Sequence, residues 1–165
     1  MTPKSQTSDD KRIALFAGSF NPFTVGHASL VERGLELFDK VVIAIGINSA
    51  KTDDGEAEAR RRDIADLYAD RSDRVDVIVN SDRLTVDVAA SVGARWLLRG
   101  VRSVKDFEYE RDLADVNRQI SGLETIILFT LPQHSAISSS VVRELQAYGH
   151  DVTDFVPHKT PNNEQ

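Results

Sequence analysis

Short apolar runs alternate with amphipathic segments along most of this chain. Five runs have the length and composition of buried strands, and they cover residues 13–17, 41–47, 75–79, 96–98 and 125–130. Strands that alternate with helices are typical of parallel sheets covered on both faces. The pattern therefore predicts an α/β protein with a doubly wound, five-stranded parallel sheet.

The segments between the strands have helical periodicity. Apolar residues repeat at helical spacing around Leu30–Phe38, from Tyr109 to Ile120 and around Val141–Leu145. The segment Glu56–Ala69 is strongly charged instead. Within it, we expect Glu56 to pair with Arg60 and Glu58 with Arg62, because residues four apart are neighbours on a helix.

The first strand leads into a turn and a helix that together resemble a phosphate seat. Gly18 and Ser19 form the turn, Thr24 is a suitable N-cap, and His27 then takes the third helical position. Free backbone N–H groups and the helix dipole favour an anion at such a helix start. A lone histidine is more often structural, but this setting favours contact with phosphate.

A second group of charged residues follows the fourth strand. Arg99 and Arg102 flank Gly100, and two guanidinium groups in one turn are suited to bidentate phosphate binding. We expect Gly100 to allow a tight turn and a close approach of ligand to backbone. Asp106 and Glu110 share a helix face, either as paired catalytic carboxylates or as partners that orient the arginines.

Two further features lie at the same predicted edge of the sheet, where ligands of such folds bind. Ser138, Ser139 and Ser140 precede the last helix, which suggests a second phosphate-binding helix start with Arg143 in its first turns. Lys51 follows the second strand and is either a solvated loop residue or a phosphate ligand. The remaining histidines show no metal-ligand spacing, and no nucleophile triad is legible.

Composition narrows the classes of function. The chain has 165 residues, a formal charge of -6 and no cysteine, and its first residues lack the apolar core of a signal peptide. We expect a cytoplasmic protein that binds neither nucleic acid nor membrane. We also expect one domain over residues 12–157, with a flexible extension at 1–11 and a flexible tail at 158–165.

Three segments carry a resemblance to a known family. Residues 18–27 resemble the T/HxGH signature of the nucleotidyltransferase superfamily, and residues 99–110 and 137–157 look like bacterial phosphopantetheine adenylyltransferases. The resemblance implies a Rossmann-like domain that transfers AMP from ATP to 4'-phosphopantetheine. It also implies Mg²⁺ carried with ATP, no dedicated metal site in the protein, coenzyme A or dephospho-coenzyme A as a product or feedback ligand, and a homohexamer.

The resemblance also assigns residues. His27 would stabilise charge on the α-phosphate, and Lys51, Arg102 and Ser139 complete the implied catalytic set. The implied ligands of the acceptor substrate are Ser19, Lys51, Thr85 and Arg99. The implied ATP-side residues are Ser19, Phe20, His27, Gly100, Val101, Arg102, Glu110, His134, Ser135, Ala136, Ile137, Ser138, Ser139 and Ser140.

Some residues depart from that family. Asn21 stands where the family has aspartate, and this local sequence is closer to nicotinate or nicotinamide mononucleotide adenylyltransferases. Such an enzyme is the main alternative, and a cytidylyltransferase is a weaker one. A regulatory module that binds nucleotide without turnover is the non-enzyme alternative.

Overall fold

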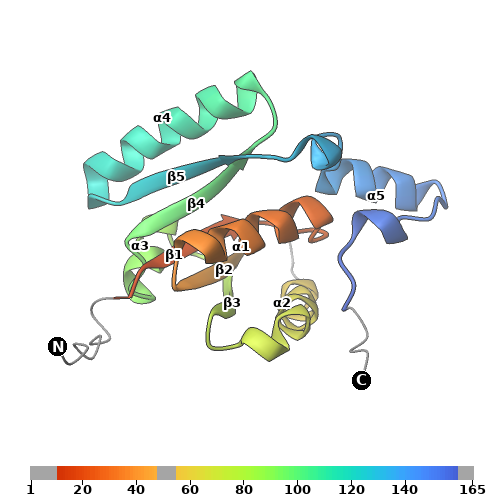
Figure 1. The fold of residues 1–165 in the computed structure, drawn as a ribbon, viewed down its shortest axis with the longest axis horizontal. Helices are drawn as coiled ribbons and strands as arrows, with labels where there is room; N and C mark the ends of the chain where they lie inside the picture. The colour runs from red at the N-terminus through yellow and green to blue at the C-terminus, as the bar shows by residue number, and fades with distance from the viewer. Residues whose placement is uncertain (1–10, 48–54, 160–165) are drawn as a thin grey trace.

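The computed structural model describes residues 11–47 and 55–159, and they form a parallel sheet flanked by helices (Figure 1). Five strands are hydrogen-bonded in the order β3-β2-β1-β4-β5, and every pairing is parallel. The strands are β1 (Ile13–Gly18), β2 (Lys40–Gly46), β3 (Val75–Asn80), β4 (Trp96–Val101) and β5 (Glu124–Phe129). The order reverses between β1 and β4, which confirms the predicted doubly wound sheet and locates its switch point.

The helices follow the strands in alternation. They are α1 (Val25–Leu37), α2 (Glu56–Leu67), α3 (Thr85–Ser91), α4 (Val104–Ser121) and α5 (Ser139–Ala147). The described residues also include three short 3₁₀ turns, η2 (Ala69–Arg71), η3 (Pro132–His134) and η4 (Thr153–Phe155). The short helix α3 was not among the predicted helices, because seven residues are too few for a clear periodic signal.

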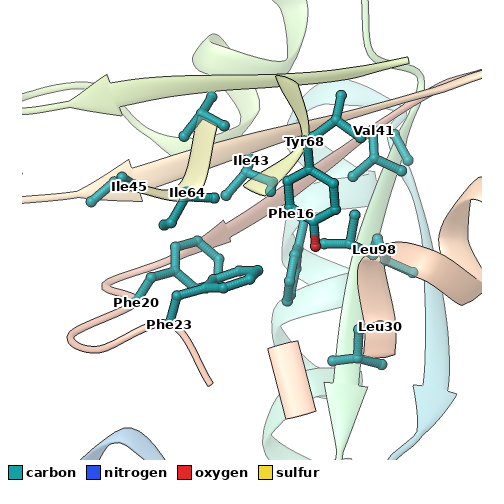
Figure 2. Close-up of a cluster of buried hydrophobic side chains, with 14 of the residues drawn as sticks. Phe16, Phe20, Phe23, Leu30, Val41, Ile43, Ile45, Ile64, Tyr68 and Leu98 are labelled. Carbon is teal, nitrogen blue, oxygen red and sulfur yellow. The ribbon is translucent and has the colours of Figure 1, made fainter. Parts of the chain in front are cut away.

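The buried side chains form one cluster on each face of the sheet. Alternate residues of β1 point to opposite faces: Phe16 packs with α1 and α2, whereas Leu15 packs with α3. In the cluster with α1 and α2, Phe20 and Phe23 contribute rings from the loop that follows β1 (Figure 2). The loop after β1 is therefore anchored in the core.

Two local expectations were wrong. β4 extends through Val101, so Arg99 and Gly100 belong to the strand itself and not to a turn after it. In α2, Glu56 pairs with Arg60 at 3.8 Å as expected, but Glu58 pairs with Arg61 at 2.7 Å instead of Arg62. Both three- and four-residue spacings bring side chains together on a helix, so spacing alone does not select the partner.

The apolar stripe of α4 faces outward. Tyr109, Val116 and Ile120 are each more than half exposed, and Leu113 is 36% exposed. Glu110 is the buried residue of this helix. Among the described residues, no helix has the length and apolar character needed to cross a membrane.

Candidate active site

The candidate site is a cavity of about 420 Å³ at the carboxyl ends of β1 and β4. It lies at the switch point of the sheet, as the fold class predicts. Residues from the starts of α1, α4 and α5 line it together with the two strand ends. Three segments that are distant in sequence therefore meet at this cavity.

The start of α1 is closed by a capping box between Thr24 and His27. The Thr24 hydroxyl accepts a hydrogen bond from the His27 backbone N–H at 3.4 Å, and the Thr24 backbone N–H donates to His27 Nδ1 at 3.0 Å. Thr24 is therefore the N-cap and His27 is the third helical residue, as the sequence predicts. One ring nitrogen of His27, Nδ1, therefore has its hydrogen-bond partner within the protein.

Three aromatic rings pack around His27. The ring centroids of Phe16, Phe20 and Phe23 lie 6.2, 5.0 and 5.5 Å from that of His27. Burial, and to a smaller extent the positive charges of Arg102 and Arg99, lower the pKa of His27 to about 4. His27 is therefore a neutral imidazole at neutral pH.

The opposite side of the cavity carries the two arginines and the two carboxylates. Arg99 donates to Glu110 through Nε at 2.8 Å and Nη2 at 2.6 Å, and through Nη1 to the Ala17 carbonyl at 2.5 Å. Arg102 Nε lies 3.5 Å from Asp106, which also accepts the Arg102 backbone N–H. The carboxylates thus orient the arginines, which is the second of the two interpretations from sequence.

Gly100 does not lie in the tight turn that was predicted, although it does line the cavity. It lies within β4, and a Cβ built on it would be 2.3 Å from Cδ1 of Leu30 in α1. β4 and α1 therefore approach each other closely at Gly100. As a result, the strand that carries Arg99 lies directly against α1.

The serine run begins α5 and ties it to the loop after β1. Ser138 is the N-cap, and its hydroxyl accepts from the Val141 N–H. Ser139 Oγ donates to the Pro22 carbonyl at 2.8 Å, and Arg143 donates to Ser140 Oγ and to the Asn21 carbonyl. Arg143 therefore holds the loop, although its position in the sequence suggested a phosphate ligand.

Most of the predicted ATP-side residues line this cavity. Those that do are Ser19, Phe20, His27, Gly100, Arg102, Glu110, Ile137, Ser138, Ser139 and Ser140. Val101 is buried, and His134, Ser135 and Ala136 lie at and just after η3, outside the cavity lining. Lys51 lies outside the described residues.

A smaller cavity of about 240 Å³ lies next to the first, and Arg99 lines both. It contains Thr85 at the start of α3, so the structure brings together the two described residues that were assigned to the acceptor substrate alone. Asn80, the last residue of β3, also lines it and was missed from sequence. Its position at a strand end of the ligand edge was the available signal.

Two solved structures are similar to this chain in fold. A bifunctional nicotinamide mononucleotide adenylyltransferase/ADP-ribose pyrophosphatase from Francisella tularensis matches with a TM-score of 0.65 at 15% identity, over 92% of this chain and 46% of that one. A structure described as a nicotinate-nucleotide adenylyltransferase from Vibrio parahaemolyticus matches with a TM-score of 0.62 at 19% identity, over 90% and 88%. At these identities the likeness shows a shared Rossmann-like nucleotidyltransferase fold.

Sequence comparison is more specific. The cytidylyltransferase-like family profile matches residues 15–145. Phosphopantetheine adenylyltransferase of Porphyromonas gingivalis is 56% identical over 147 residues, which cover 89% of this chain and 95% of that protein. The chain belongs to the phosphopantetheine adenylyltransferase family.

A second member of the phosphopantetheine adenylyltransferase family shows how far the similarity extends. The enzyme of Bacteroides thetaiotaomicron is 47% identical over 146 residues, covering 88% of this chain and 95% of that protein. The match therefore extends over most of the chain rather than over one motif. This confirms the family to which residues 18–27, 99–110 and 137–157 pointed.

Proposed function

We propose that this protein transfers AMP from ATP to 4'-phosphopantetheine, giving dephospho-coenzyme A and pyrophosphate. The observation that carries the proposal is the 56% identity to a phosphopantetheine adenylyltransferase over nearly the whole of both chains. Two adjoining cavities that share Arg99 are consistent with two phosphorylated substrates meeting at one reacting phosphate.

In this proposal the acceptor phosphate attacks the α-phosphate of ATP in line, and pyrophosphate leaves. The attacking oxygen is already ionised at neutral pH, so the reaction requires no protein base. His27, neutral and held at the start of α1, donates a hydrogen bond where negative charge grows on the α-phosphate. Charge stabilisation and positioning then supply the catalysis.

The larger cavity is proposed for ATP. Arg102 is exposed and held by one long contact, so it can turn toward the triphosphate. The backbone N–H groups at the start of α5 favour an anion in the same place. Ser139 is proposed to act through its position at that helix start, since its hydroxyl is bonded to Pro22.

The smaller cavity is proposed for the acceptor. Thr85 and Arg99 would bind it there, with Ser19 at its phosphate. Lys51, which lies outside the described residues, is assigned to the acceptor by the family resemblance alone. Arg99 is fixed by Glu110 and by the Ala17 carbonyl, so it presents a constant positive charge between the two cavities.

The donor set of the larger cavity does not fit a metal ion held by the protein. Its two carboxylates, Asp106 and Glu110, are both engaged with arginines. Within residues 11–47 and 55–159, no group of three or more histidines and carboxylates is arranged to hold a metal. We therefore assign Mg²⁺ to the ATP phosphates, whose charge it would neutralise, and derive no step from it.

The protein is proposed to act as a homohexamer in the cytoplasm. The exposed apolar stripe of α4, from Tyr109 to Ile120, supports self-association because such patches on a monomer usually mark interaction sites. Light scattering coupled to gel filtration would give the mass of the assembly.

Coenzyme A is a feedback ligand implied by the family. We expect it to compete with 4'-phosphopantetheine when pyrophosphate release is measured.

Pyrophosphate release tests the reaction. It would be measured with ATP plus 4'-phosphopantetheine, with ATP plus nicotinate mononucleotide, and with CTP plus glycerol phosphate. We expect release with the first pair alone. Release only with the nicotinate pair would replace the proposal with the alternative that Asn21 favours, and nucleotide binding without any release would indicate a regulatory module.

A further inference from the structure

A further cavity, of about 400 Å³, lies beside α2, and we call it the α2 cavity. Three segments line it: the loop at residues 20–23, the part of α2 from Arg60 to Leu67, and residues 156–159 after η4. Its volume is in the range of small-molecule sites. Phe20 is the one residue that lines both the α2 cavity and the cavity proposed for ATP. The occupant of the α2 cavity therefore has to be inferred from its own chemistry.

The inner wall of the α2 cavity is apolar. Phe20, Phe23 and Ile64 are buried members of one hydrophobic cluster, and Figure 2 shows them next to one another. Leu67 and Val156 add partly buried aliphatic side chains. A ligand with an apolar body can therefore remove that body from water by packing against these side chains.

Arg60 is the least exposed charged residue of this lining. Its side chain is 19% exposed, and its Nε is buried without a hydrogen-bond partner. Its ion pair with Glu56 is long, at 3.8 Å, and Glu56 is exposed. Within residues 11–47 and 55–159, Arg60 donates no hydrogen bond, although a guanidinium offers several N–H groups. The guanidinium is therefore available to an anion.

The other charged residues of the lining are at its rim. Asp63 and Asp66 of α2 and Lys159 after η4 are all exposed, so water solvates their charges. The charge beside the apolar wall is that of Arg60. A carboxylate matches the planar fork of a guanidinium, whereas an ammonium group would meet a charge of its own sign there. The lining thus favours an apolar molecule with one carboxylate.

Phe20 connects the α2 cavity to the proposed chemistry. Its ring centroid lies 5.0 Å from that of His27. Its backbone has a φ of 47°, a left-handed conformation that is unfavourable for a residue with a side chain and is held by the packing around it. The same loop is bonded to α5 through the Asn21 and Pro22 carbonyls. A ligand that presses on this loop would therefore disturb both His27 and the start of α5.

We propose that the α2 cavity is a regulatory site for a small organic carboxylate with an apolar body. Arg60 binds the carboxylate, the body packs on Phe23 and Ile64, and the effect of binding reaches the larger cavity through Phe20. Binding at this site does not depend on the proposed function, whereas its effect on the reaction rate does. Coupling between the two cavities must be reciprocal, so nucleotide and carboxylate change each other's affinity by the same factor.

The test uses 4-phenylbutyrate as the probe and the full-length protein. Calorimetric titration measures its Kd, and 4-phenylbutyramide and 4-phenylbutylamine test the sign of the charge. Arg60→Gln removes the proposed ligand, and Leu67→Trp fills the cavity. Arg62→Gln is the matched control, because Arg62 is an exposed arginine of α2 that lines none of the three cavities described. Arg102→Gln tests whether the probe binds in the larger cavity instead.

We expect 4-phenylbutyrate to bind with a Kd of about 1 mM or lower, and the amide and the amine to bind at least about tenfold more weakly. Arg60→Gln and Leu67→Trp should each weaken binding of the acid by about tenfold or more. Arg62→Gln and Arg102→Gln should change it by less than about twofold.

The coupling is measured separately. The probe and an ATP analogue that cannot be cleaved should weaken each other's binding by the same factor, of about twofold or more. Saturating probe should also lower kcat for pyrophosphate release in the wild type and leave it unchanged in Arg60→Gln.

Several results would overturn the proposal. Amine that binds as tightly as the acid would show that the acidic rim, and not Arg60, selects the ligand. Binding lost in Arg102→Gln and kept in Arg60→Gln would place the probe in the larger cavity. Affinities that are independent of each other would refute the coupling through Phe20. If Leu67→Trp does not fold, the two arginine variants and the uncharged probe still decide. Wild type that binds the probe but releases no pyrophosphate would refute the proposed function and leave the site standing.

Discussion

The two sides of the larger cavity hold their polar groups in opposite ways. On the α1 side, His27 is enclosed by three aromatic rings and tied to Thr24 by short contacts. On the side formed by β4 and α4, Arg102 is 42% exposed and held at 3.5 Å by a single carboxylate. In the proposed reaction this difference suits two tasks: a group that stabilises a transition state gains from being fixed, and a group that captures a mobile polyphosphate gains from being free to move.

The same contrast recurs between the two arginines. Arg99 makes three hydrogen bonds and pairs with Glu110, whose side chain is 8% exposed. Arg102, three residues later, is 42% exposed, against 29% for Arg99. Arg99 is therefore fixed by the fold, whereas the guanidinium of Arg102 is freer to move. The following predictions test this division from the largest expected effect to the smallest.

Replacing His27, the fixed group on the α1 side of the cavity, should have the largest effect on activity. His27→Ala is expected to lower kcat by on the order of a hundredfold or more, because it removes a hydrogen bond made at the developing charge, while ATP binding survives. Steady-state kinetics and calorimetric titration with ATP measure the two quantities. His150→Ala, an exposed histidine outside the cavities, serves as the matched control. An equal loss of ATP affinity would make His27 a ground-state ligand instead.

Removing each arginine in turn should separate stability from binding. Arg99→Ala leaves the buried carboxylate of Glu110 without its partner and should lower the free energy of unfolding by about 2 to 3 kcal/mol. Arg102→Ala breaks an exposed contact and should cost less than about 1 kcal/mol of stability while weakening ATP binding. Urea titrations of both variants measure the first quantity. Equal stability losses would show that the two arginines are not divided in this way.

Acid should destabilise the protein through His27. Its pKa is about 4 in the folded state and about 6.5 when unfolded, so between these values the unfolded chain binds a proton that the folded chain does not. The contribution of neutral His27 is complete above pH 6.5 and is lost progressively as the pH falls toward 4, by on the order of 2 kcal/mol.

Urea unfolding of the wild type and of His27→Gln from pH 4 to 8 isolates this contribution. The difference between the two proteins should change within that window and be constant above it. A difference that does not vary with pH would mean that His27 has an ordinary pKa.

Of the four predictions, the one for Gly100→Ala, which adds a methyl group between β4 and α1, has the smallest expected effect. Gly100→Ala would place a Cβ 2.3 Å from Leu30, so Leu30 or the strand must shift, and we expect a loss of about 1 to 2 kcal/mol of stability. Gly46→Ala is the matched control, because its Cβ would meet no atom closer than 3.8 Å. Equal stability of the two variants would indicate that the packing of α1 on β4 is adaptable.

The sheet and the start of α1 could be predicted because their signals are local. Apolar runs mark the strands, and Thr24 is readable as an N-cap that puts His27 at the third helical position. The assignment to a family came from three motifs, and comparison with relatives confirmed it.

What could not be predicted depends on contacts between distant segments. The role of Gly100 is set by Leu30, and that of Arg143 by the Asn21 carbonyl, and neither partner is near in the chain. The outward orientation of the apolar stripe of α4 could not be predicted either. Helical periodicity shows that one face of a helix is apolar, but it does not show what covers that face. The assigned roles of the cavity residues remain predictions for the experiments above.

The bonds from Ser139 to Pro22 and from Arg143 to Asn21 join positions 117 and 122 residues apart. Both bonds tie the loop that leads to α1 to a helix encoded far downstream. A fragment that ends before Ser138 would lack both bonds, so the loop that precedes His27 would lose its attachment to α5 and that side of the cavity would be open.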